Sequence, residues 1–221
     1  MNDMTKKAQT SSETENTSVP LTIHRPFGPS IAKVQMPKHF IDLLNSHIDA
    51  EEQGARNTLN FGSYLAANVS QELRLKDEFV RDIGFLEFLA KSAQVWINKE
   101  SGRQITKFDL MSCWVVRQFK NEFNPIHHHG GHICGVGYLK LPEEFGDYVQ
   151  DNKHHNLNGH IQFIHGSHQF LSSAILSARP EVGNFYLFPN YLLHTVYPFF
   201  AEGERRSVSF NALIDNEIFN A

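Results

Sequence analysis

The sequence is poor in the features that mark several large classes of protein. It holds 2 cysteines in 221 residues, too few for a disulfide framework, so we expect a reducing compartment and a cytoplasmic protein. No apolar run approaches the roughly 20 residues of a membrane span, and the polar first twenty residues lack a signal-peptide core, so we expect no membrane partner. The formal net charge of -4 argues against nucleic acid as the main partner.

The composition nevertheless allows a folded core. Hydrophobic residues make up 41% and charged residues 20%, which excludes disorder as the global state. Residues 1–20 contain no aromatic side chain and are predicted to form a disordered polar tail. The length favours a single domain over residues 21–221. The sequence has 13 histidines, and most of them lie between His127 and His194.

Two segments in the first half have helical periodicity. Residues 37–50 begin with proline and repeat apolar side chains at helical spacing. Residues 77–98 carry a longer apolar stripe, with Asp77 as the expected N-cap and Gly84 as the expected position of a kink. We therefore expect a helical layer over about 37–100 that packs against a sheet.

From about residue 105 the pattern changes to short apolar runs separated by glycine and proline. No glycine-rich phosphate loop of the Rossmann or Walker type is present. Many short strands with this punctuation predict a mainly β sandwich or barrel over about 105–215. The expected strands are residues 105–119, 132–141, 159–164, 184–188, 193–197 and 205–214.

A candidate metal site lies in the sequence Asn-Pro-Ile-His-His-His-Gly-Gly at 124–131. If the chain is extended there, His127 and His129 point to one face and His128 to the other, so the first two can bind one ion. A third ligand must come from a distant strand, and His194 lies in a suitable apolar run. Taken alone, a histidine in such an apolar run is usually a core histidine that makes one hydrogen bond.

A candidate anion site follows on the last predicted strand. Arg205, Ser207, Ser209 and Asn211 share one face of that strand by alternation. Burying an arginine and two serines on one face is costly unless an anion binds them. The alternative is a polar face in contact with solvent.

Four separated motifs occur in an order that resembles a known family. They are Asn-Pro-x-His-x-His-x-Gly at 124–131, Gly-Val-Gly-Tyr-Leu at 135–139, Phe-Pro-x-x-Leu-x-His at 188–194 and Glu-Arg-x-Ser-x-Ser-Phe-Asn at 204–211. Over about residues 30–218 the sequence resembles the 2-oxoglutarate- and Fe(II)-dependent oxygenases, of the prolyl-hydroxylase-like kind found in marine phages and bacteria.

The resemblance implies a double-stranded β-helix, the jelly roll of cupin-like proteins, supported by N-terminal helices. It implies Fe(II) bound by His127, His129 and His194, with O2 and 2-oxoglutarate as cosubstrates. Arg205, assisted by Ser207, corresponds to the residue that pairs with the distal carboxylate of 2-oxoglutarate, and Gln118 is a weaker candidate for a hydrogen bond to it. The implied activity is a dioxygenase that hydroxylates an unidentified small molecule or protein side chain, releasing succinate and CO2, in the host cytoplasm if the gene is phage-encoded.

One position departs from the usual pattern of the family. The usual facial triad has two histidines and one carboxylate, and His129 stands where the carboxylate would be. Three neutral imidazoles do not reduce the positive charge of a divalent ion, whereas a carboxylate ligand would. A doubly anionic 2-oxoglutarate can compensate for that charge. Zinc or nickel would also accept three histidines.

Two other functions stay open at this point. One is a cupin-like metalloenzyme with a three-histidine site that does not use 2-oxoglutarate. The other is a non-catalytic jelly-roll module with a structural metal. Outside the three ligands, we expect His154 and His155, in the loop 147–158, to belong either to a lid over the site or to a passive surface loop.

Overall fold

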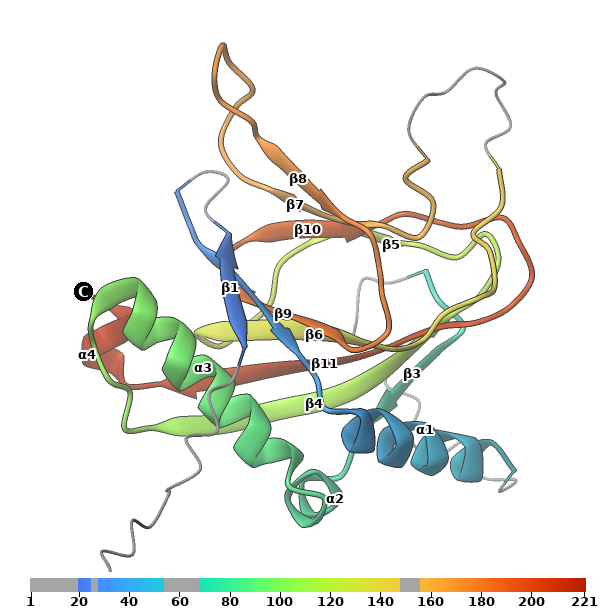
Figure 1. The fold of residues 1–221 in the computed structure, drawn as a ribbon, viewed down its shortest axis with the longest axis horizontal. Coiled ribbons are helices and arrows are strands. Elements are labelled where there is room, and N and C mark those ends of the chain that lie inside the picture. Colours follow the sequence, from blue (N-terminus) through green and yellow to red (C-terminus); the bar gives the residue numbers. More distant parts are fainter. Residues whose placement is uncertain (1–19, 25–27, 54–67, 148–155) are drawn as a thin grey trace, which may run out of the picture.

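The structure of the protein is a computed structural model that describes residues 20–24, 28–53, 68–147 and 156–221 (Figure 1). The predicted tail 1–20 lies outside the described residues except for Pro20. His154 and His155 also lie outside them, so the structure does not distinguish a lid from a passive surface loop there.

The described part of the chain contains four helices and eleven strands. The helices are α1 (Lys38–Gln53), α2 (Asp77–Asp82), α3 (Phe85–Ser101) and α4 (Asn216–Phe219). The strands are β1 (Leu21–His24), β2 (Ile31–Gln35), β3 (Gln71–Arg74), β4 (Phe108–Gln118), β5 (Asn124–His127), β6 (Ile133–Lys140), β7 (Ile161–Ile164), β8 (Ile175–Ala178), β9 (Asn184–Pro189), β10 (Leu193–Val196) and β11 (Arg205–Ile214).

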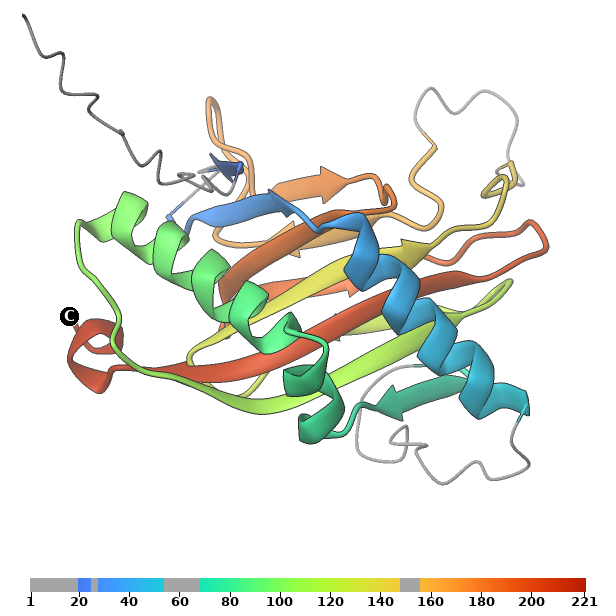
Figure 2. The same ribbon diagram turned by 60° about the horizontal axis from the view of Figure 1, so that its bottom comes forward.

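The strands form two facing antiparallel sheets. A seven-stranded sheet has the order β1-β2-β9-β6-β11-β4-β3, and a four-stranded sheet has the order β5-β10-β7-β8. Helices α1 and α3 lie across the outer face of the larger sheet, and the smaller sheet lies on its other side (Figure 2). This three-layer arrangement confirms the predicted jelly roll with supporting helices.

The long helix predicted over 77–98 is wrong in its extent, because the segment forms two helices. Gly84 separates α2 from α3 with a left-handed φ of 76°, a conformation that favours glycine. The prediction that Asp77 caps the helix is also wrong. Lys76 occupies the N-cap position in extended backbone, and Asp77 is the first helical residue, where its charge favours the helix N-terminus.

The six strands predicted from sequence correspond to β4, β6, β7, β9, β10 and β11. The sequence did not predict β1, β2, β3, β5 and β8, which are four or five residues long. Alternation is weak evidence for a strand in segments this short, and β3 in addition has a glutamate and an arginine in its Gln-Glu-Leu-Arg sequence.

Apolar side chains form two buried layers, one on each face of the larger sheet. Beneath the helices, Phe85 packs with Phe185 and Phe210 of the sheet, whereas Phe163 and Phe188 pack between the two sheets. Gly137 of β6 makes room for this packing, because a Cβ there would lie 2.1 Å from the Phe185 ring. The sheet is therefore fixed from both sides, which holds the strands that carry the candidate site.

A buried ionic network holds the start of β11. Arg117 of β4 and Arg206 of β11 are register partners, and Glu204 accepts hydrogen bonds from their Nε atoms at 2.6 and 2.7 Å. Arg206 Nη2 also donates to Asp49 of α1 at 2.8 Å. Burial by itself would raise the pKa of Glu204, but the hydrogen bonds and charges of the two arginines lower it to about 2. The carboxylate therefore stays charged and offsets the repulsion between the two cations.

Candidate active site

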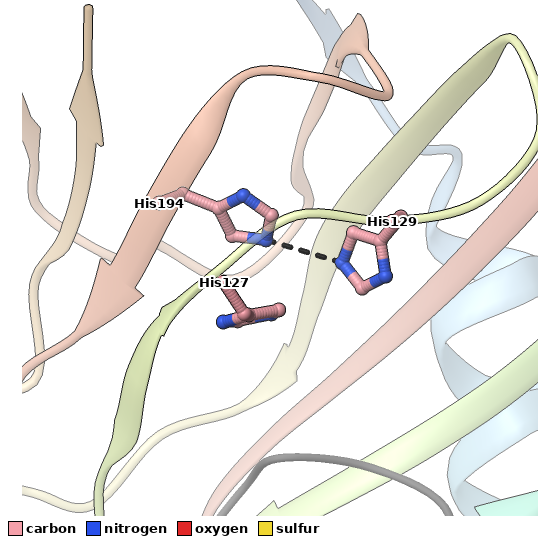
Figure 3. Close-up of side chains that lie close together, drawn as sticks. All are labelled: His127, His129 and His194. Atoms are coloured by element: carbon pink, nitrogen blue, oxygen red, sulfur yellow. Dashed lines mark hydrogen bonds between the residues drawn. The ribbon is translucent and has the colours of Figure 1, made fainter.

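His127, His129 and His194, the candidate metal ligands, meet between the two sheets. His127 and His194 are register partners on the neighbouring strands β5 and β10, and His129 follows two residues after β5 (Figure 3). Each offers a ring nitrogen, and these atoms all lie within 4.8 Å of one another. The Nε2 atoms of His129 and His194 are 3.1 Å apart. Two nitrogens bound to one ion at about 2.1 Å lie roughly 3 Å apart in cis positions, so this spacing suits a shared metal.

Backbone carbonyls orient two of the three imidazoles. His127 Nδ1 lies 2.7 Å from the oxygen of Pro125, and His194 Nδ1 lies 2.9 Å from that of Leu192. A neutral imidazole that donates from Nδ1 has its lone pair on Nε2, which is the arrangement that metal-binding histidines commonly have. These two contacts therefore prepare Nε2 of both rings for an ion.

The cluster is held in the neutral form that a metal needs. Burial, followed by the neighbouring histidines, lowers the pKa of His129 and of His194 to about 3. Burial also lowers the pKa of His127. At neutral pH the three rings are therefore uncharged, and the residues present fit a divalent ion such as Fe(II), Zn(II) or Ni(II).

Arg205 lies in the same cavity as a buried cation that is incompletely paired. Its side chain is only 2% exposed, and its Nε and Nη2 atoms have no hydrogen-bond partner among the described residues. Its guanidinium carbon lies 4.9 Å from the centre of the Tyr138 ring. Burying a guanidinium group costs free energy unless an anion pairs with it, so this geometry fits a carboxylate ligand.

Gln118 holds Arg205 in place. Its Oε1 accepts a hydrogen bond from Arg205 Nη1 at 3.2 Å. Its Nε2 donates to the backbone oxygens of Glu122 at 2.6 Å and Tyr197 at 3.1 Å. The amide hydrogens are thus already engaged, which makes Gln118 a positioning residue in this arrangement. Ser207 lines the cavity two residues after Arg205, as the strand alternation predicted.

The histidine cluster and the Arg205 group line one cavity of about 250 Å³. Its other walls include apolar side chains from both sheets, among them Val116, Val136, Ile161 and Phe188. Ligand pockets commonly measure about 300–1,000 Å³, and this cavity is slightly smaller, so it can hold only a small molecule.

Sequence reasoning missed several residues of this cavity, and Glu72 is the most notable. Glu72 lies on β3, is 2% exposed and lines the cavity together with Val69, Trp114 and Asn124. Burial raises its pKa to about 7. In Gln-Glu-Leu-Arg-Leu at 71–75, alternation places Glu72 on the face opposite the two leucines, but nothing in the sequence shows that this face is buried.

Four other histidines in the second half of the chain, His128, His132, His165 and His168, lie at the edge of the site or outside it. His128 is exposed at the edge of the cavity. His132 stacks on Phe219 with ring centroids 3.9 Å apart, and Ile214 N donates to its Nδ1 at 3.1 Å. His165 and His168 are exposed and are not among the residues that line the cavity.

Residues 112–211 match the family model described as "Putative 2OG-Fe(II) oxygenase". This region includes the three histidines, Gln118, Arg205 and Ser207. It is the family that the four sequence motifs predicted. No curated protein matches the chain in sequence.

Solved structures share the fold at low sequence identity. AviO1 from Streptomyces viridochromogenes Tue57 is 14% identical to this chain and has a TM-score of 0.57. The superposition covers 84% of this chain and 90% of AviO1. A prolyl-4-hydroxylase from Pseudomonas putida is 14% identical with a TM-score of 0.53, covering 82% and 91%. The collagen prolyl hydroxylase of Paramecium Bursaria Chlorella virus-1, solved with 2-oxoglutarate, is 16% identical with a TM-score of 0.53, covering 82% and 94%.

None of the helices in the described ranges is both long and apolar enough to span a membrane. The likeness to solved structures establishes the fold, and the family model covers the strands that carry the histidines and Arg205. Together, the family match over residues 112–211 and the shared jelly roll confirm the predicted resemblance to the 2OG-Fe(II) oxygenases.

Proposed function

We propose that the protein is an Fe(II)- and 2-oxoglutarate-dependent dioxygenase that hydroxylates its substrate. One observation carries the proposal beyond the family match. A buried, incompletely paired Arg205 shares a small cavity with three neutral histidines whose ring nitrogens lie within 4.8 Å of one another. An anion site next to a metal site is what a cosubstrate that binds both would need.

In this proposal His127, His129 and His194 hold the iron through ring nitrogens. Carbonyl contacts to Nδ1 orient His127 and His194, while burial keeps all three rings unprotonated. Three protein ligands leave other coordination positions open for small molecules. With 2-oxoglutarate and O2, bound Fe(II) supplies the oxidative decarboxylation that yields succinate and CO2 and hydroxylates a C–H bond of the substrate.

Arg205 and Ser207 bind the distal carboxylate of 2-oxoglutarate. The free Nε and Nη2 atoms of Arg205 are two adjacent donors of a planar fork, which can bind both oxygens of a carboxylate. Gln118 fixes the guanidinium through Nη1 and leaves this edge available. The apolar walls around the cavity keep water away, which strengthens the charge pairing.

The substrate in this proposal is a small molecule or a protein side chain. The prolyl hydroxylases among the structural relatives, one of them solved with a peptide fragment of hypoxia-inducible factor, support this range. We place the reaction in the cytoplasm, which is the host cytoplasm if the gene is phage-encoded. The buried free thiols of Cys113 and Cys134 support a reducing compartment.

The test measures 2-oxoglutarate binding and turnover in the iron-loaded protein. We expect Arg205→Ala to abolish 2-oxoglutarate binding while Fe(II) binding stays within about twofold of the wild type. Arg81→Ala is the matched control, because Arg81 is an exposed arginine in α2. O2-dependent formation of succinate by the wild type is expected, and a wild-type protein that neither binds nor converts 2-oxoglutarate would overturn the proposal.

One observation favours a second candidate, a three-histidine metalloenzyme that does not use 2-oxoglutarate. His129 occupies the position that a carboxylate has in the usual facial triad, and its ring joins the cluster. Under this alternative, Arg205→Ala would leave the metal-dependent chemistry intact, so the same variant separates the two functions.

A further inference from the structure

The cavity contains a buried carboxyl group that the proposed chemistry does not use. Glu72 of β3 is 2% exposed, and its Oε2 atom has no hydrogen-bond partner among the described residues. It is not a member of the histidine cluster, so it is not placed as a further metal ligand. A buried, unpaired carboxyl group lowers the free energy of unfolding unless a ligand satisfies it.

Strand register places Glu72 beside the expected position of the cosubstrate. Glu72 pairs with Val116 on β4, and Val116 pairs with Ser207 on β11, so the three side chains share one face of the sheet. Neighbouring strands lie about 4.8 Å apart, which separates Glu72 from Ser207 by roughly 10 Å along the row. Arg205 lies two residues before Ser207 on β11, and its register partner on β4 is Gln118. The cavity can therefore hold an anion at Arg205 and a second group at Glu72.

Two more side chains that line the same cavity add to its chemical character. Asn124 also lines the cavity, and its Oδ1 atom is buried without a hydrogen-bond partner. Trp114 adds an aromatic wall, with its ring 5.6 Å from that of His129. A carboxylate, an amide oxygen and an indole ring together match an ammonium group, which donates hydrogen bonds and is attracted to aromatic faces.

We propose that Glu72, with Asn124 and Trp114, forms a subsite for the protonated amine of the substrate. This inference rests on the proposed function, because it assigns the substrate class of the same site. Arg205 then binds the anionic cosubstrate, and Glu72 binds a cationic group of the substrate. The metal cluster lines the same cavity as both.

The experiment compares an amine with its neutral isostere on the Ni(II)- and 2-oxoglutarate-loaded protein. The probes are n-butylammonium and n-butanol, and their dissociation constants are measured by NMR titration. The wild type is expected to bind the ammonium at least tenfold more tightly than the alcohol. Glu72→Gln keeps the size and an acceptor but removes the charge, so it should lose this preference.

Controls separate a failure of this inference from a failure of the proposed function. Glu78→Gln, at an exposed position of α2, should keep the preference. The affinity for 2-oxoglutarate, measured in the same samples, should not be weaker in Glu72→Gln than in the wild type. Equal affinity of the wild type for both probes, no binding of either, or an unchanged preference in Glu72→Gln would overturn the amine subsite. Absence of 2-oxoglutarate binding in the wild type would instead refute the cosubstrate, and the probes would then be compared on the Ni(II)-loaded protein alone.

Discussion

Replacing Glu72 by glutamine should stabilise the metal-free protein at alkaline pH and have little effect at acidic pH. Glu72 is 2% exposed, and its Oε2 atom has no hydrogen-bond donor within the described residues. Burial raises its pKa from 4.5 to about 7. Glutamine has nearly the same shape and carries no charge at any pH.

The magnitude follows from the linkage between protonation and folding. Below pH 4.5 the carboxyl group is protonated in both the folded and the unfolded chain, so it carries no penalty. As pH rises towards about 7, the unfolded chain releases its proton more readily than the folded protein, and the free energy of unfolding falls. Above the folded pKa the full loss is about 3 kcal/mol, since each pKa unit corresponds to about 1.4 kcal/mol.

The measurement is urea unfolding of both proteins at about pH 5 and pH 8 in the presence of a chelator. The histidine cluster acts in the opposite direction, because the lowered pKa values of His129 and His194 cost stability as pH falls. This contribution is common to both proteins, so only the difference between wild type and variant reports on Glu72. The variant should gain about 2 to 3 kcal/mol over the wild type between the two pH values.

A constant difference between the two proteins across pH would refute the reasoning. It would mean that Glu72 has its ordinary pKa in the folded state and therefore meets water or a cation. A variant less stable than the wild type at pH 8 would show that the carboxylate makes a stabilising contact, and that outcome would also remove the basis for an amine subsite.

Three further predictions concern the network, the metal and the sheet. Glu204→Gln should lower the free energy of unfolding by about 3 to 5 kcal/mol in urea titrations, because it removes the carboxylate that Arg117 and Arg206 share and leaves Arg206 only the half-exposed Asp49. A loss under about 1 kcal/mol would contradict this. His129→Asp should keep Fe(II) binding but weaken 2-oxoglutarate binding several-fold in calorimetry, because the added carboxylate reduces the charge of the site; unchanged or tighter 2-oxoglutarate binding would argue against His129 as a ligand. Gly137→Ala should cost about 1 to 3 kcal/mol in thermal unfolding, because its methyl group would overlap the Phe185 ring; an unchanged melting temperature would show that the core can repack.

The sequence was most informative where chemistry and periodicity coincide. On β11, alternation correctly divided Arg205, Ser207 and Ser209, which line the cavity, from Val208 and Phe210, which lie in the core beneath the helices. The motif around His127 showed which rings could share an ion, because a two-residue spacing in extended chain puts both on one side.

The sequence did not predict which distant strands and loops contact each other. Glu72 lies on an edge strand of four residues, far in sequence from the three histidines and Arg205, and its burial depends on contacts made only in the folded chain. The partners of Gln118 were equally hidden, because two of them are backbone oxygens fixed only when the loops pack. Such contacts depend on register, which a single sequence does not specify.

The distance in sequence between the metal ligands has a consequence for folding. His129 and His194 are 65 residues apart, so a bound ion acts as a crosslink that closes a long loop. Closing a loop of this length in an unfolded chain costs roughly 4 kcal/mol of chain entropy, so the ligands meet only after β5 and β10 have paired. Metal added to the folded protein should therefore slow unfolding far more than it speeds folding. An ion bound for chemistry would then also determine how long the native state survives.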